Sequence, residues 1–145
     1  MNKREHILLA KDNENDATLL RRAIESANIK ASLQVVRDGQ EAVDYLAGVN
    51  SYADRIVHPF PKLMLLDLRM PRLDGFEVLN IVRGRLGFTQ LPVIVLTHSE
   101  NPADIRRAYE LGATSYFRKP DSLEGLDEMI HVLHAYWLKF NHFPE

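Results

Sequence analysis

Short apolar runs and amphipathic segments alternate five times along the chain. The apolar runs, each long enough for one strand, are residues 7–10, 33–36, 63–66, 92–96 and 115–117. The segments after them carry apolar residues at helical spacing and cover residues 15–27, 38–47, 74–83, 102–111 and 122–139. Strands that alternate with helices predict a doubly wound α/β domain, in which a five-stranded parallel sheet has helices on both faces.

Three of the predicted strands are candidates for the centre of the sheet. The runs at 7–10, 63–66 and 92–96 are apolar throughout rather than alternating, which is typical of strands that are covered on both faces. In open parallel sheets, ligands bind at the carboxyl ends of the strands. The residues directly after each strand are therefore the first place to look for chemistry.

Helix boundaries are marked by capping residues. Asp38 and Asp74 each precede a predicted helix, and Glu41 and Glu77 follow three residues later, which is the spacing of a capping box. Gly48 stands where a helix C-terminus needs a left-handed residue. These signals support the predicted helix limits.

The composition adds limits to this picture. The 145 residues fit one compact domain, which we expect to span residues 1–145 with a slightly extended C-terminal helix and tail. The net charge of −2 disfavours a nucleic-acid-binding surface, and the absence of cysteine excludes thiol catalysis and disulfides. No apolar run approaches the roughly 18–20 residues that cross a membrane, and residues 7–10 are too few for a signal peptide. We therefore expect a cytoplasmic protein with no nucleic-acid or membrane partner.

Reactive side chains follow four of the predicted strands. Asp12 follows the first strand, Asp67 the third, Thr97 the fourth and Lys119 the fifth. Two carboxylates, a hydroxyl and an ammonium should therefore converge at one edge of the sheet. This set suits phosphoryl transfer to a carboxylate, because that reaction needs positioning and neutralisation of negative charge. Mg²⁺ would be held by carboxylate oxygens, and a lysine adds a point charge.

The segments around these residues resemble the CheY-like receiver family of response regulators, and the resemblance covers nearly the whole chain. The matching segments are residues 7–13, 65–71, 74–75, 93–97 and 112–120. The resemblance implies a flavodoxin-like sheet with strand order 2-1-3-4-5. It also implies phospho-signal reception in a two-component phosphorelay, with no enzymatic activity beyond self-phosphorylation and autodephosphorylation.

The same resemblance implies roles at the acceptor and at a metal site. Asp67 would be the phosphoacceptor. Asp12 would ligate Mg²⁺ together with Asp67 and the backbone carbonyl of Arg69.

Further roles concern the switch from the unphosphorylated to the phosphorylated state. Thr97 would bond the phosphoryl group and shift on activation, and Tyr116 would be the coupled aromatic rotamer switch. Lys119 would pair with a phosphoryl oxygen, and its bond to Pro120 would be cis.

Three residues depart from the family pattern. The family normally has an acidic pair after the first strand, but here the first of the two is Lys11. A cation there would weaken Mg²⁺ binding by like-charge repulsion, and it could form a salt bridge to Asp67 that partly substitutes for the metal. The alternative is that Lys11 points to solvent. His98 and Arg69 could likewise restrict access to the acceptor, or they could be solvated side chains.

The chain looks closest to the receivers that are paired with bacterial phytochromes. The cues are the long segment 49–61 with Tyr52 and Pro59, the stand-alone format, and the residues 136–138 near the C-terminus. The resemblance implies a histidine kinase partner, which for this subgroup would be a bacterial phytochrome, and signalling by protein–protein contact. Segment 49–61 is either a partner-binding insertion or a passive surface loop.

The last predicted helix carries more apolar residues than one buried face needs. One stripe is Leu123, Leu126, Ile130, Leu133, Trp137 and Phe140; the second is Met129, Val132 and Tyr136. One stripe should pack on the sheet, and the second favours a homodimer through this helix and its neighbours.

Two other functions stay open. A pseudo-receiver, which keeps the fold without the phosphorylation cycle, is favoured by Lys11 and opposed by Asp67, Thr97 and Lys119. A small flavodoxin-like or hydrolase-like enzyme would need a glycine-rich phosphate loop or a carboxylate at position 69, where the chain has Arg69.

Overall fold

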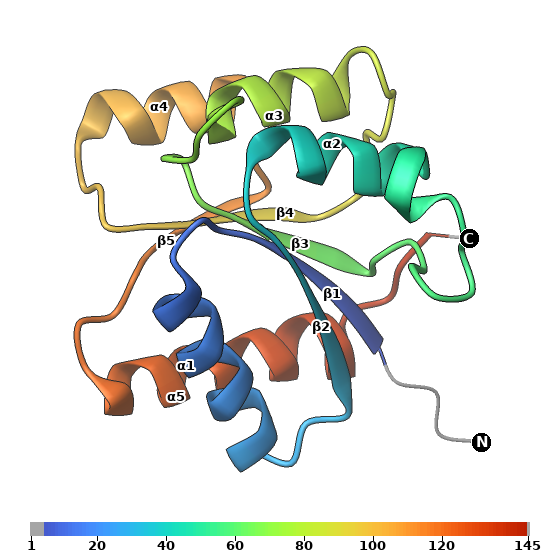
Figure 1. The fold of residues 1–145 in the computed structure, drawn as a ribbon. Coiled ribbons are helices and arrows are strands. Elements are labelled where there is room, and N and C mark those ends of the chain that lie inside the picture. Colours follow the sequence, from blue (N-terminus) through green and yellow to red (C-terminus); the bar gives the residue numbers. More distant parts are fainter. Residues whose placement is uncertain (1–4, 145) are drawn as a thin grey trace.

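Five parallel strands form one sheet in the computed structural model, which describes residues 5–144 (Figure 1). Their order is β2-β1-β3-β4-β5, and every neighbouring pair is parallel. The strands are β1 (Glu5–Ala10), β2 (Ala31–Val36), β3 (Leu63–Leu66), β4 (Val93–Thr97) and β5 (Ser115–Arg118). The predicted doubly wound α/β fold and its strand order are confirmed.

Helices cover both faces of the sheet. Helices α2, α3 and α4 lie on one face, and α1 and α5 lie on the other (Figure 1). The α-helices are α1 (Glu14–Ser26), α2 (Gly39–Ala47), α3 (Gly75–Arg83), α4 (Pro102–Glu110) and α5 (Leu123–Leu133). A short 3₁₀ turn, η1 (Asn50–Tyr52), follows α2, and a π-helical segment, η2 (His134–Phe140), continues α5.

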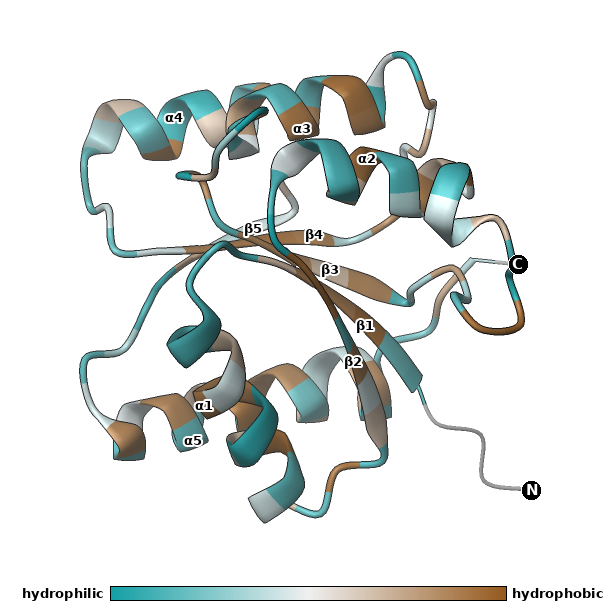
Figure 2. Ribbon diagram, viewed as in Figure 1, coloured by the Kyte–Doolittle hydropathy of each residue, from teal (hydrophilic) through white to brown (hydrophobic). Residues whose placement is uncertain are grey.

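The hydrophobic core consists of two layers separated by the sheet. Side chains alternate between the faces of each strand, so that Leu8 and Met64 belong to the layer under α2 and α3, whereas Leu9 and Leu65 belong to the layer under α1 and α5. The central strands β3 and β4 are accordingly mostly apolar along their length (Figure 2). Strands β1, β3 and β4 lie in the middle, as their uninterrupted apolar sequences predict.

The predicted caps are present. The side chain of Asp74 accepts from the amide of Glu77, and the Glu77 side chain accepts from the Asp74 amide, which completes a capping box. Asp38 accepts from the amide of Glu41 at 2.8 Å, but the reciprocal bond is not formed. Gly48 ends α2 with φ = 68°, in the left-handed region.

Beyond the short 3₁₀ turn η1, the segment 49–61 is held by specific contacts. The Arg55 guanidinium donates to the carbonyl oxygens of Leu46 and His58, at 2.7 and 3.0 Å. The Tyr45 hydroxyl donates to the carbonyl of Pro59 at 2.9 Å. Ile56 at its tip is 93% exposed, so the segment forms an ordered, partly apolar surface.

The C-terminal helix differs from its prediction. The α-helix ends at Leu133, and the next seven residues form a wider π-helical turn. The wider turn breaks the 3.6-residue spacing, so that Phe140 leaves the packed face and is exposed. The two predicted stripes are also wrong in detail, because Met129 is buried whereas Leu123 is exposed.

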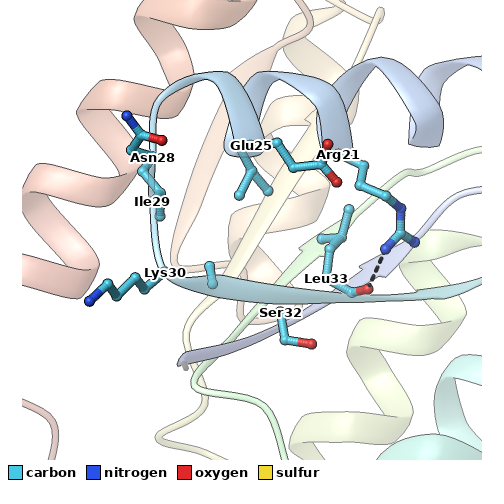
Figure 3. Close-up of a pocket in the computed structure, with 9 residues that line it drawn as sticks. Arg21, Glu25, Asn28, Ile29, Lys30, Ser32 and Leu33 are labelled. Atoms are coloured by element: carbon cyan, nitrogen blue, oxygen red, sulfur yellow. Dashed lines mark hydrogen bonds between the residues drawn. The ribbon is translucent and has the colours of Figure 1, made fainter. Parts of the chain in front are cut away.

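A hollow lies beside the edge strand β2, where α1 ends and β2 begins (Figure 3). Arg21 of α1 donates to the carbonyl of Leu33 at 3.2 Å and so occupies one acceptor of this edge strand. Leu33 pairs with Ile7, which in turn pairs with Leu63 at the start of β3. The hollow is therefore remote from the carboxyl end of β3, where Asp67 lies.

Arg83 of α3 joins the connection before β4 to the connection between α4 and β5. Its guanidinium donates to four oxygen atoms, which are the carbonyls of Phe88 (2.6 Å), Leu91 (2.7 Å) and Gly112 (2.9 Å) and the hydroxyl of Thr114 (3.3 Å). No carboxylate pairs with Arg83 among the residues described. The residue therefore acts as a hydrogen-bonding hub.

Replacement of this hub should destabilise the fold. We expect Arg83→Met to lower the free energy of unfolding by about 3 kcal/mol, because partly buried oxygens lose a charged donor. Urea denaturation measures the change. Arg85→Met is the matched control, since Arg85 is exposed and two residues away; equal losses in the two variants would contradict the assignment.

Candidate functional site

The carboxyl ends of the central strands meet at one edge of the sheet. The amide of Asp67 donates to the carbonyl of Ala10 at 3.0 Å, which places the residues after β1 beside the residues after β3. The amide of Lys119 donates to the carbonyl of Thr97 at 2.7 Å and links the ends of β4 and β5. Asp67 and Thr97 are both buried. The structure thus brings together Asp67, Thr97 and the backbone of Lys119.

Lys11 contacts Asp67 directly. Its Nζ lies 3.0 Å from Asp67 Oδ2 and 3.5 Å from Asp16 Oδ2. The residue is only 5% exposed, so the alternative in which Lys11 points to solvent is wrong. The salt bridge considered from the sequence is present.

Lys119 contacts a carboxylate in this structure. Its ammonium pairs with Asp16 Oδ1, and no ion pair joins it to Asp67 in residues 5–144. Asp16 thus lies between Lys11 and Lys119. The charged side chains alternate in sign along the line Asp67, Lys11, Asp16, Lys119.

Asp16 was missed by the reasoning from sequence. It lies in the first turn of α1, three residues after the cap Asn13, where an acidic side chain is already explained by the helix dipole. The presence of two lysines, Lys11 and Lys119, at this edge is the feature of the sequence that indicates a further carboxylate such as Asp16. Two lysines that end neighbouring parts of a buried sheet edge need more than one carboxylate.

The pKa of Asp16 reflects these contacts. Burial by itself would raise its pKa, but the hydrogen bond and charge of Lys119, together with the charge and hydrogen bond of Lys11, outweigh burial. The net effect lowers the pKa of Asp16 below its ordinary value of 3.8. Asp16 is therefore held in its ionised form.

The oxygen atoms at this edge of the sheet are of the kind that binds a divalent cation. Asp12 is exposed and lines an open hollow with Arg69, and Asp67 lines the neighbouring hollow, also with Arg69. Two carboxylates and a backbone carbonyl are ligands that Mg²⁺ accepts. The part of the chain that the structure describes holds no cluster of three His, Asp or Glu side chains. A cation would also share the Asp67 carboxylate with the Lys11 ammonium.

The loop between β3 and α3 is fixed on both sides. The amide of Gly75 donates to Leu68 at 2.9 Å, and a Cβ on Gly75 would lie 2.4 Å from the carbonyl oxygen of Asp67. Only glycine permits this approach. On the other side, Arg72 has φ = 68°, and its guanidinium lies 3.3 Å from Asp38. The carbonyl of Arg69 is thus carried by a constrained loop.

The switch residues predicted from the sequence lie near the loop after β4. The hydroxyl of Tyr116 donates to the carbonyl of Ser99 at 2.9 Å, and the hydroxyl of Ser99 donates to Asp104 at 2.7 Å. Burial is the main cause that raises the pKa of Tyr116. Thr97 ends β4, two residues before Ser99, so the loop connects the two predicted switch positions.

The structure also describes the Lys119–Pro120 bond and the side chains of Arg69 and His98. The predicted cis bond between Lys119 and Pro120 is wrong, since residues 5–144 contain no cis peptide bond; a prolyl bond prefers trans unless its surroundings impose cis. The Arg69 side chain is largely exposed, and its closest acidic contact is Asp104 at 3.9 Å. His98 is exposed too and borders the hollow that reaches Asp67.

Comparison with protein families gives a match over most of the chain. Residues 7–131 match the response regulator receiver domain. A relative named as a probable methanogenesis regulatory protein, FilR2 of Methanothrix harundinacea, is 38% identical over 95% of this chain and 86% of its own length. The response regulator Rcp1 of Synechocystis is 34% identical over 92% of this chain and 88% of its own length.

Solved structures agree with the fold over the whole length. The phosphorylated cyanobacterial phytochrome response regulator RcpA superposes with a TM-score of 0.89 at 32% identity, covering 99% of this chain and 100% of its own. The Mn²⁺-bound form of Rcp1 gives a TM-score of 0.85 at 33% identity, with 97% and 99% coverage. Divalent metal is therefore bound by a relative with the same architecture.

The ion pairs of Asp16 give a pH-dependent prediction. We expect the Asp16 carboxyl to titrate below 3.8 in ¹³C NMR, and to titrate higher in Lys119→Met, where burial remains and one cation is lost. Because the pKa is lowered by folding, ionised Asp16 stabilises the fold above the unfolded pKa, and this stabilisation is lost as pH falls through the folded pKa. Lys30→Met, an exposed lysine remote from the site, should leave the midpoint unchanged. An unchanged midpoint in Lys119→Met would contradict the assignment.

Proposed function

Because this chain belongs to the response regulator receiver family, whose members signal in phosphorelays, we propose that it accepts a phosphoryl group on Asp67 from a histidine kinase. The observation that carries the proposal is the position of Asp67. Its carboxylate is buried at the end of β3 and contacts the Lys11 ammonium, and it borders an open hollow with Thr97. A donor can therefore approach a carboxylate whose surroundings are already positively charged on one side.

The proposed transfer proceeds by direct displacement. An oxygen of Asp67 attacks the phosphorus of the donor, and the bond between phosphorus and the leaving atom breaks, with its electron pair going to the donor. The hydroxyl of Thr97 donates a hydrogen bond to a phosphoryl oxygen, and Lys119 exchanges Asp16 for the more highly charged phosphoryl group. The Ser99 loop then transmits the change to Tyr116.

A divalent metal ion takes part in the proposed transfer. Asp12, Asp67 and the carbonyl of Arg69 would hold Mg²⁺, which supplies neutralisation of the charge on the phosphoryl oxygens when it is bound. The Mn²⁺-bound structure of Rcp1 supports a divalent cation. Lys11 should make the binding weaker than an acidic residue would.

The partner that we propose is a histidine kinase of the phytochrome type. The support is the likeness to RcpA, which is described as a phytochrome response regulator. We further propose that the chain acts by protein contact in the cytoplasm, with no catalytic activity beyond its own phosphorylation and dephosphorylation. No helix in residues 5–144 is long and apolar enough to span a membrane.

We also propose a homodimer. Val132, Tyr136 and Phe140 are exposed at four-residue spacing along the end of α5 and η2, and a hollow beside them is lined by residues of β5 and α5. Apolar side chains that line up on one surface are typical of an interface. Strand β5 lies at the edge of the sheet and adds an unpaired backbone edge to this surface.

The pseudo-receiver remains the second candidate, and one observation favours it. The Lys11 ammonium is bonded to the same carboxylate that would have to attack phosphorus. Nothing in the site favours the hydrolase-like enzyme, because the side chain at position 69 is an exposed arginine.

Phosphorylation of Asp67 can be tested without the kinase. On incubation with acetyl phosphate and Mg²⁺, the intact mass of the wild type should increase by one phosphoryl group, and that of Asp67→Asn should not. An adduct on both proteins would assign another acceptor. No adduct on the wild type with acetyl phosphate or a phosphorylated histidine kinase would establish the pseudo-receiver.

The dimer can be tested by light scattering over a range of concentrations. We expect Tyr136→Glu to raise the dimer dissociation constant about 100-fold, because a charge replaces a central aromatic contact. Ile56→Glu is the control, since it places the same charge at an exposed apolar site outside the proposed interface. A wild type that stays monomeric at all concentrations would refute the dimer.

A further inference from the structure

Lys11 is fixed at the phosphoacceptor by its surroundings. Its backbone amide donates to the carbonyl of Val36 at 3.0 Å, which anchors the residue to β2. Its ammonium is almost completely buried and lies within 3.5 Å of carboxylate oxygens of both Asp67 and Asp16. A buried ammonium needs such anionic partners, because an uncompensated charge in the interior costs several kcal/mol. Lys11 is therefore held with its charge directed at Asp67.

Asp16 makes this arrangement possible. Its Oδ2 contacts the Lys11 ammonium and its Oδ1 contacts the Lys119 ammonium, so each lysine has an anionic partner beside the acceptor. If phosphoryl oxygens drew Lys119 away, Asp16 would still bind Lys11. The Lys11 ammonium thus stays next to the acceptor before and after transfer.

The fixed Lys11 ammonium changes the net charge around the acceptor, which affects phosphoryl transfer. Receivers of this family normally have an acidic residue where this chain has Lys11, and that residue would make the edge more negative by two charges. The presence of Lys11 therefore changes the local charge by as much as one divalent cation does. Since phosphoryl transfer is assisted mainly by positioning and by neutralising negative charge, a fixed ammonium can take over part of that task.

The contacts of Asp67 leave one oxygen for the attack. Oδ2 accepts from Lys11 at 3.0 Å, whereas Oδ1 has only a long contact of 3.4 Å with the amide of Arg69. In the proposed step Oδ1 bonds to phosphorus, and the leaving group departs with the electron pair of its bond to phosphorus. Lys11 remains protonated and transfers nothing. It balances charge that would otherwise build up beside the carboxylate.

We propose that Lys11 is a built-in counter-ion of the acceptor, which makes phosphorylation of this chain largely independent of divalent metal. The inference rests on the proposed function, since it needs Asp67 to be the acceptor. Lys11 would thus assist the reaction as well as weaken the binding of Mg²⁺.

The test compares initial rates of adduct formation with acetyl phosphate in excess EDTA and in saturating Mg²⁺, followed by intact mass. Removal of metal should slow the wild type less than about tenfold and Lys11→Glu by about 100-fold or more, a loss similar to removing one charge-stabilising group. With Mg²⁺, both proteins should react at comparable rates. Lys30→Glu makes the same charge change at an exposed lysine beside the remote hollow in Figure 3, and should behave like the wild type.

Metal affinity gives a readout that does not depend on phosphorylation. In calorimetric titration with Mg²⁺, Lys11→Glu should bind at least about tenfold more tightly than the wild type, because repulsion is replaced by attraction. Lys11→Met, which keeps the aliphatic stem, should lie between them. Lys11→Met also replaces Lys11→Glu in the rate comparison if the charge reversal prevents folding.

The outcomes separate this inference from the proposed function. A wild type that forms the Asp67 adduct with Mg²⁺ but loses it in EDTA as completely as Lys11→Glu would refute the counter-ion and leave the receiver function intact. A wild type that forms no adduct in either condition would refute the receiver function itself. Equal Mg²⁺ affinities in the wild type, Lys11→Met and Lys11→Glu would also refute the counter-ion.

Discussion

The parallel pairing of β1, β3 and β4 is the constraint on which the rest of the structure depends. These strands are buried on both faces, so their backbone groups must find partners within the sheet, and this pairing sets where each strand ends. The residues that follow the strands then meet at one edge, whatever their chemistry. Lys11 and Asp67 come into contact because the amide of Asp67 extends the pairing of β3 with Ala10 of β1.

Burial makes the charges at that edge depend on one another. Asp67 and Lys11 are both largely removed from solvent, and each needs an opposite charge nearby. Asp16 supplies the second carboxylate and binds Lys119 as well. A phosphoryl group on Asp67, as proposed, would add negative charge to this line and would attract Lys119 away from Asp16, while Lys11 would stay beside the acceptor.

Hydrogen bonds link this edge of the sheet to β5, which lies beside the C-terminal surface. The backbone of Lys119 is bonded to Thr97, and Tyr116 on β5 is bonded to the loop after β4. Residues of β5 line a hollow together with Val132 of α5 and Tyr136 of η2, which are both exposed. The proposed chemistry and the proposed dimer would thus use separate surfaces of the chain, and one short edge strand, β5, lies next to both.

The sequence by itself determined the five strands, the burial of the three central ones, the capping of α2 and α3, and the meeting of Asp67 with Thr97 and Lys119 at one edge. These features depend on local spacing and on the geometry of any parallel sheet. Only the tertiary structure decided which carboxylate each lysine binds, that Asp16 joins the site, and that the C-terminal helix widens after Leu133. Several charges lie within reach of one another there, so the pairing follows from differences of a few ångströms between elements distant in the chain. No periodicity in the sequence records such distances.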